Sequence, residues 1–125
     1  MTTEDATPGD VTIWHNPRCS KSRGALAELG ELGVQPQVVR YLDTAPGRAE
    51  LENVLRMLGT TDPRAIMRTG EAVYRELGLA GADREALLDA LVAHPVLIER
   101  PIVMVGDRAV VARPPERVRE LLEPR

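Results

Sequence analysis

The spacing of apolar residues divides the chain into segments of two different periods. Val11–Trp14 and Val38–Leu42 are short, β-prone runs. Between them, from Cys19 to about Leu32, leucines recur at helical spacing, and Gly33 is expected to end that helix. Because a short pair of parallel strands needs a crossover connection, this opening predicts a β-α-β unit.

The middle of the chain, about residues 47–93, is predicted to be helical. An amphipathic i, i+3, i+4, i+7 spacing is set by Leu51, Val54, Leu55 and Leu58. Asp62 and Pro63 are expected to cap and open a short helix through Met67, and Asp83 to cap another. One face of that last helix is expected to hold Leu87, Leu88, Leu91 and Val92.

The period changes again at the end of the chain. Ile102–Val105 and Ala109–Val111 are apolar strands joined at Gly106-Asp107-Arg108, which is typical of a hairpin turn. Pro114-Pro115 then opens a last helix, whose apolar residues are Val118, Leu121 and Leu122. The order β-α-β, three helices, β-β-α predicts an α/β protein with a four-stranded mixed sheet and flanking helices. This is the thioredoxin-like architecture, with a helical insertion between its two halves.

The 125 residues are enough for one domain with a substantial core. We expect a flexible N-terminal tail at residues 1–10, which are polar and carry Gly9, and a single domain at residues 11–125. The chain has no Phe, and its only aromatic residues are Trp14, Tyr41 and Tyr74. The core is therefore expected to consist of Leu, Val, Ala and Ile.

Charge and composition narrow the class of function. The net charge of −3 argues against nucleic acid or an anionic membrane as the main partner. No apolar run approaches the roughly 20 residues that span a bilayer, and no signal-peptide pattern opens the chain. A single cysteine permits no internal disulfide, which fits a cytoplasmic protein. His15 and His94 are far apart and do not give a zinc-binding spacing, so no metal site is expected.

The lone cysteine is the strongest candidate for chemistry. Cys19 lies between the first strand and the first helix, where unpaired backbone N–H groups and the helix dipole favour a thiolate. Cationic side chains surround it in sequence, namely Arg18, Lys21 and Arg23. A buried cysteine that acts as a small hydrophobe is the alternative. The polar neighbours on both sides favour a reactive nucleophile.

Three arginines are candidates for binding an oxyanion beside this thiol. Arg100 precedes Pro101, a candidate cis proline, and the third strand, whereas Arg113 precedes Pro114 after the fourth strand. Arg68 ends the short helix of the insertion. A guanidinium group suits bidentate contact with a tetrahedral oxyanion, although most arginines are solvated surface charges.

Smaller groups are candidates for supporting roles. His15 is expected to steady the loop or influence the protonation of the thiol, or else to be structural. Ser22 lies one turn after Cys19 and either bonds the sulfur or the ligand, or is a first-turn hydroxyl that bonds backbone. We expect His94 to end a helix and Glu99 to pair with a neighbouring basic residue.

Taken together, the motifs resemble the glutaredoxin-coupled arsenate reductases, the ArsC family. The likeness covers about Val11 to Leu122. It is carried, in order, by His15-Asn-Pro-Arg-Cys19-Ser-Lys-Ser-Arg23, Tyr41-Leu-Asp-Thr, Arg64-Ala-Ile-Met-Arg68, Glu76-Leu-Gly-Leu79, His94-Pro-Val-Leu-Ile-Glu-Arg100-Pro-Ile-Val and Ala112-Arg113-Pro114. The family's fold is thioredoxin-like with a helical insertion, which agrees with the predicted order of elements.

The resemblance implies a site and a reaction. It makes Cys19 the nucleophile that attacks arsenate, and it places around the oxyanion the three arginines Arg68, Arg100 and Arg113. Supporting positions in the active-site loop fall on His15, Ser22 and Arg23. It implies no bound cofactor, glutathione as the thiol co-substrate and glutaredoxin as the partner. Arg18 stands where some members have a small residue, which leaves the reducing partner open.

Three other functions remain as alternatives. An Spx-like regulator that binds RNA polymerase often carries a Cys-x-x-Cys switch, but the position three after Cys19 is Ser22. A related thiol oxidoreductase with another substrate is the second alternative. A monothiol glutaredoxin-like protein would not need all three arginines, whereas a reductase of another oxyanion would keep them.

Overall fold

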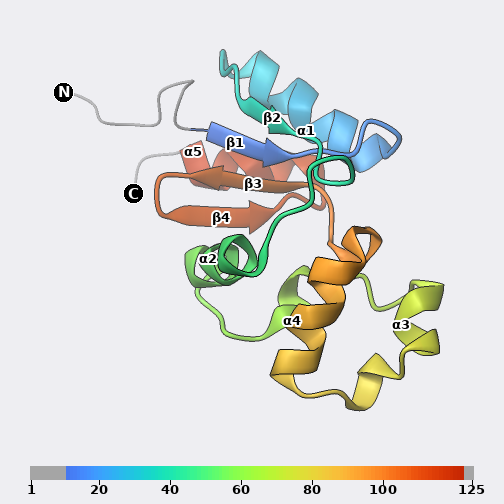
Figure 1. The fold of residues 1–125 in the computed structure, drawn as a ribbon. Coiled ribbons are helices and arrows are strands. Elements are labelled where there is room, and N and C mark those ends of the chain that lie inside the picture. Colours follow the sequence, from blue (N-terminus) through green and yellow to red (C-terminus); the bar gives the residue numbers. More distant parts are fainter. Residues whose placement is uncertain (1–10, 123–125) are drawn as a thin grey trace. The chain divides into compact units, whose positions relative to one another are not determined.

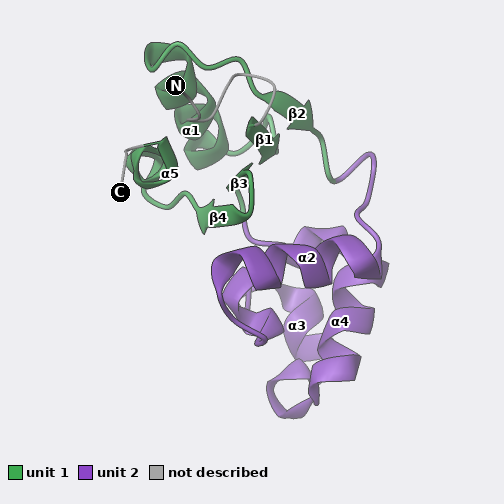
Figure 2. Ribbon diagram, turned by 90° about the vertical axis from the view of Figure 1, so that its left-hand side faces the viewer, with its two compact units in different colours: residues 1–41, 100–125 green, residues 42–99 purple. Residues whose placement is uncertain are grey.

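The computed structural model describes residues 11–122, so the predicted tail at residues 1–10 lies outside the described residues. The chain divides into two compact units (Figure 2). Unit 1 comprises Met1–Tyr41 with Arg100–Arg125, and unit 2 comprises Leu42–Glu99. The helical insertion expected at about residues 47–93 falls within unit 2. The single-domain organisation stays a prediction.

Unit 1 contains a four-stranded mixed sheet, as the sequence predicted (Figure 1). Its strands are β1 (Val11–Trp14), β2 (Gln37–Val39), β3 (Ile102–Val105) and β4 (Arg108–Val111). They lie in the order β2-β1-β3-β4, with β1 parallel to β2 and the other pairs antiparallel. The turn between β3 and β4 contains Gly106 at φ 60°, a conformation that glycine adopts without strain.

The second strand is shorter than predicted. The sequence predicts a strand at Val38–Leu42, but β2 spans Gln37–Val39. Tyr41 is fully buried without belonging to the strand, whereas Val38 is 43% exposed. β2 is an edge strand that pairs only with β1, and two of its three residues are exposed.

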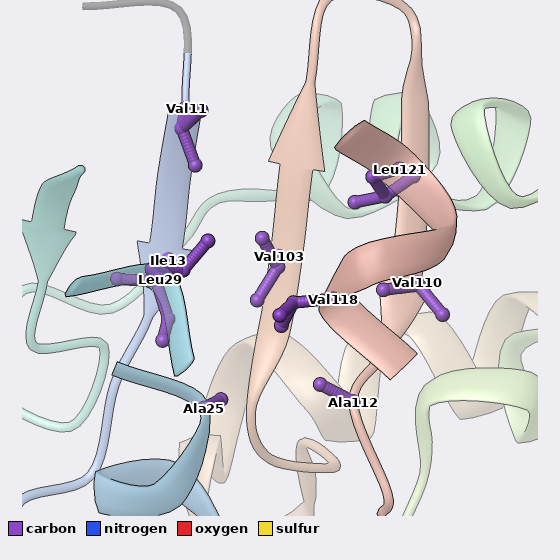
Figure 3. Packing of buried hydrophobic residues seen from close by; sticks show 9 residues of the cluster. All are labelled: Val11, Ile13, Ala25, Leu29, Val103, Val110, Ala112, Val118 and Leu121. Atoms are coloured by element: carbon purple, nitrogen blue, oxygen red, sulfur yellow. The ribbon is translucent and has the colours of Figure 1, made fainter. Parts of the chain in front are cut away.

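One face of the sheet is covered by α1 (Ser20–Glu31) and by the C-terminal pair η5 (Pro115–Val118) and α5 (Arg119–Leu122). Their shared core is entirely aliphatic (Figure 3), and its residues are Val11, Ile13, Ala25, Leu29, Val103, Val110, Ala112, Val118 and Leu121. A Cβ at Gly24 of α1 would lie 2.9 Å from Pro115 Cγ, so glycine permits the close approach of α1 to η5.

The expected restriction of the core to Leu, Val, Ala and Ile is wrong outside this cluster. Trp14 and Tyr41 are buried in unit 1, and Met67 and Tyr74 are buried in unit 2. A few large side chains fill space that many small ones would otherwise occupy, because aromatic rings bury far more area than aliphatic groups.

Unit 2 is built from short helices. They are α2 (Arg48–Leu58), η2 (Pro63–Ile66), α3 (Ala72–Glu76), η3 (Leu79–Gly81), α4 (Arg84–Ala93) and η4 (Pro95–Leu97). Both predicted caps are present, since Asp62 accepts from the Arg64 N–H and Asp83 from the Ala86 N–H. The segment after Asp62 is a 3₁₀ helix that ends at Ile66 rather than Met67.

Two details of unit 2 differ from the sequence analysis. The helix α3 was not predicted, because its five residues are too short to show a clear period and bury only Tyr74. Val92 was assigned to the buried face of α4 but is 39% exposed. Within residues 11–122, no helix has both the length and the apolar character needed to cross a bilayer.

Candidate active site

Cys19 is the N-cap residue of α1, which confirms its predicted place at a strand-to-helix junction. The thiol is partly exposed. The Cys19 N–H donates to the Asn16 carbonyl at 3.0 Å, and the Cys19 carbonyl accepts from the Arg23 N–H at 3.0 Å. The first turn of α1 contains no acidic residue. A negative charge at this position therefore faces the positive end of the helix dipole without an opposing carboxylate in that turn.

The loop that carries Cys19 is closed by its own side chains. Asn16 Oδ1 accepts from the Arg18 N–H at 3.0 Å, and the Arg23 guanidinium donates to the Pro17 carbonyl at 2.9 Å. Arg23, predicted as a supporting residue, thus ties the start of the helix back to the loop. The Arg18 side chain is exposed.

His15 and Ser22 form a buried pair beneath this loop. Ser22 is fully buried and His15 is 7% exposed. The Ser22 hydroxyl lies 2.7 Å from His15 Nδ1, and Ser22 Oγ accepts from the Asn16 N–H at 3.0 Å. The bond to the Asn16 N–H agrees with the prediction that Ser22 bonds backbone, and the second partner is the His15 ring rather than the Cys19 sulfur.

The imidazole of His15 favours its neutral form. Burial is the main cause that lowers the pKa of His15, and the positive charges of Arg40 and Arg23 lower it further. A buried neutral ring can form a hydrogen bond to Ser22 without the cost of desolvating a charge.

The register of the sheet brings together the end of β1, the start of β3 and the end of β4. Trp14, the last residue of β1, pairs with Ile102, the first residue of β3, and Ile102 pairs with Val111, the last residue of β4. The Cys19 loop follows β1, so it starts beside the segments that come before β3 and after β4 (Figure 1). Ligands of open α/β sheets bind beyond such strand ends.

Arg100 and Arg113 occupy these two segments and contact each other. The Arg113 guanidinium donates to the Arg100 carbonyl at 3.0 Å, while the Ala112 N–H donates to the Pro101 carbonyl at 2.9 Å. The peptide bond between Arg100 and Pro101 is cis, as suggested from the sequence. The bond between Arg113 and Pro114 is also cis, which was not predicted. Arg113 is exposed, and Arg100 is partly buried.

Arg68, the third predicted arginine, belongs to unit 2. Its guanidinium lies 2.7 Å from Glu71 and 3.7 Å from Glu99, and all three side chains are about one quarter exposed. An isolated antiparallel bridge between Met67 and Ile98 holds the two segments beside each other. Glu99 thus pairs with a basic residue, as expected, but the partner is remote in sequence.

Glu71 was missed in the sequence analysis. The spacing of Arg68 and Glu71, i and i+3, is an available signal, since oppositely charged residues at this spacing can pair. Their backbones also meet, because the Glu71 N–H donates to the Arg68 carbonyl at 3.2 Å.

A metal centre and a surface groove are two further kinds of ligand site. No group of three or more His, Cys, Asp or Glu residues that could hold a metal occurs within residues 11–122. A groove of about 970 Å³ in unit 2 is lined by α2, Gly59 to Thr61 and Arg84. None of the predicted site residues lines this groove.

Known proteins of similar sequence point to one family. The sequence matches the ArsC family over residues 14–121. It is 46% identical to an arsenate reductase of Neisseria meningitidis, with 90% of this chain and 98% of that protein covered. It is 45% identical to an arsenate reductase of Haemophilus influenzae, again over 90% and 98% of the two chains.

A solved structure supports the same assignment. The arsenate reductase from Vibrio cholerae superimposes with a TM-score of 0.88 at 45% sequence identity, covering 95% of this chain and all of that one. The mixed sheet, the inserted helices and the sequence match are therefore explained together. The chain belongs to the ArsC family and has its thioredoxin-like fold.

Proposed function

We propose that the protein is an arsenate reductase in which Cys19 is the nucleophile. The main observation behind this proposal is that Cys19 lies at the N-terminus of α1. Its loop starts at strand ends that adjoin the segments of Arg100 and Arg113. The arsenate reductases of similar sequence support arsenate as the substrate. Arg68 is assigned to the same oxyanion on the family resemblance.

The first step is attack of the Cys19 thiolate on the arsenic atom. One arsenate oxygen leaves as water after taking up protons, and a covalent Cys19–arsenate adduct forms. Guanidinium groups stabilise the negative charge of the remaining oxygens, which is the role proposed for Arg100, Arg113 and Arg68. The unpaired N–H groups at the start of α1 stabilise the thiolate before the attack.

The second step requires thiols from outside the chain, because Cys19 is its only cysteine. An external thiol attacks the Cys19 sulfur, and the electron pair of the sulfur–arsenic bond remains on arsenic. As(V) is thereby reduced to As(III), and Cys19 is left in a mixed disulfide. A further thiol then resolves this disulfide. We assign these reducing roles to glutathione and glutaredoxin, and no bound cofactor takes part.

A coupled assay tests the proposal. Purified protein, glutathione, glutaredoxin and glutathione reductase should consume NADPH only when arsenate is present. Cys19→Ser should abolish this consumption and keep the fold, while Ser20→Ala, which alters the exposed neighbouring residue, should retain it. Arsenate-independent consumption, or turnover by Cys19→Ser, would contradict the proposal.

The arginines are tested in the same assay. Arg100→Ala and Arg113→Ala should each lower kcat/KM for arsenate by about tenfold or more, since a charge-assisted hydrogen bond to an anion contributes about 1.5–3 kcal/mol. Arg56→Ala, an exposed arginine of α2, is the control and should behave like the wild type. Unchanged kinetics of Arg100→Ala and Arg113→Ala would show that these arginines are surface charges.

A further inference from the structure

The buried Ser22 hydroxyl makes two hydrogen bonds to the loop that leads to Cys19. Ser22 Oγ has two polar neighbours, the Asn16 N–H at 3.0 Å and His15 Nδ1 at 2.7 Å. Within residues 11–122, no third group is bonded to Oγ. Both neighbours belong to the loop that leads to Cys19.

The hydrogen atoms of this cluster can be assigned from its donors and acceptors. The Asn16 N–H can only donate, so it fills one acceptor site of Oγ. The hydroxyl carries one hydrogen of its own, and among the two neighbours only an unprotonated Nδ1 can accept it. A hydrogen on Nδ1 would leave the buried hydroxyl hydrogen without an acceptor, which costs about 1–3 kcal/mol.

We propose that Ser22 is a positioning residue of the active-site loop: it donates to Nδ1 of neutral His15, accepts from the Asn16 N–H, and so keeps the ring hydrogen on Nε2. This inference rests on the proposed function only in naming the loop as catalytic. The lowered pKa of His15 agrees with a neutral ring, and the charged groups that act on it are Arg40, after β2, and Arg23, on α1.

Asn16 connects the Ser22 hydroxyl to Cys19. Asn16 bonds Ser22 through its N–H, the Cys19 N–H through its carbonyl, and the Arg18 N–H through its side chain. Removal of the Ser22 hydroxyl would leave the Asn16 N–H and His15 Nδ1 without their partner. The loop would then relax, and the thiol would lose its orientation toward the substrate.

The first measurement is the ¹⁵N NMR spectrum of the histidine rings in the intact protein. His15 should show an unprotonated Nδ1 and a protonated Nε2 near neutral pH, and this preference should weaken in Ser22→Ala. His94, the only other histidine, is the internal reference, and His15→Gln assigns the signals. A hydrogen on Nδ1 in the wild type would overturn the inference even if Ser22→Ala did not fold.

The second measurement is the rate of Cys19 alkylation and the kinetics of arsenate turnover. Ser22→Ala should slow the alkylation of Cys19 and lower kcat, each by about 10- to 100-fold, with little change in KM. Misplacement of a reacting group by about 1 Å has effects of this size. Ser20→Ala is the matched control, and Ser22→Thr, which keeps the hydroxyl, should restore part of the rate. Equal rates for Ser22→Ala and Ser20→Ala would overturn the inference. Alkylation and NMR need no arsenate, so failure of the proposed function would be seen separately.

Discussion

The two units hold their proposed functional residues by different forces. In unit 1 the loop of Cys19 is tied down through the buried neutral pair His15 and Ser22, and the exposed Arg23 guanidinium adds a bond to the Pro17 carbonyl. In unit 2 Arg68 is held by two carboxylates while about one quarter of its side chain stays exposed. Burial of a charge is costly, whereas a neutral hydrogen-bonded pair can lie in the interior. The partial exposure of Arg68 is compatible with its proposed role of binding a substrate anion.

Both units contain buried aliphatic residues, and unit 2 adds a network of hydrogen bonds made by one arginine. The sheet of unit 1 packs on helices through nine aliphatic residues (Figure 3). Unit 2 also buries aliphatic residues, among them Leu51, Leu88 and Leu91. In addition, Arg64 joins η2 to α3 and η3, because it donates to the Tyr74 hydroxyl at 3.1 Å and to the carbonyls of Leu79 and Ala80 at 2.8 and 3.1 Å.

The aliphatic core of unit 1 should give the largest effect on stability. Leu29→Ala removes a fully buried side chain of α1 and should lower the free energy of unfolding by about 2–5 kcal/mol. Leu32→Ala, at a residue that is 37% exposed, is the control and should change it by about 0.5 kcal/mol or less. Chemical denaturation measures both, and similar losses for the two variants would contradict the assignment of the core.

Removal of the Arg64 guanidinium should loosen unit 2 selectively. Arg64→Ala frees three acceptors that join η2 to α3 and η3, so the amides of α3 should exchange with solvent faster. The hydrogen bond with Tyr74 is also the main cause that raises the pKa of Arg64. Hydrogen exchange should show little change in the amides of β1 and β3, and an equal acceleration in both units would contradict the comparison.

The carboxylates beside Arg68 should weaken its binding to an anion. Glu71→Gln keeps the size of the side chain and removes its charge, so KM for arsenate should fall by roughly two- to fivefold, the range expected of a partly exposed ion pair. Glu99→Gln should act in the same direction but less, because its distance is 3.7 Å rather than 2.7 Å. In an Arg68→Ala background neither change should matter, and a higher KM in Glu71→Gln would show that the carboxylate positions Arg68 for binding.

Acid should weaken unit 1 through His15. The pKa of His15 is lowered in the folded protein, so the unfolded chain takes up a proton first as the pH falls below about 6.5. The free energy of unfolding should therefore decrease between pH 7.5 and 5.5, a window above the titration of ordinary carboxyl groups. His15→Gln should flatten this decrease, and His94→Gln should leave it in place. A wild-type stability that rises over the same window would contradict the burial of a neutral ring.

The sequence by itself determined the local elements that depend on nearest neighbours. The strands at Val11–Trp14 and Ile102–Val105, the caps Asp62 and Asp83 and the place of Cys19 at a helix start all follow from patterns a few residues long. The catalytic and substrate-binding roles remain predictions from the resemblance. The fold class was also accessible, because the order of periods restricts how such strands can pair.

Only the tertiary structure decided which side chains meet across long separations. The pairing of Arg68 with Glu99 depends on a bridge between segments about thirty residues apart. The contact of His15 with Ser22 spans only seven residues, yet it requires the turn through Asn16 to bring strand and helix together. Local propensity does not encode such contacts, because the partners meet only when the packed chain brings their segments together.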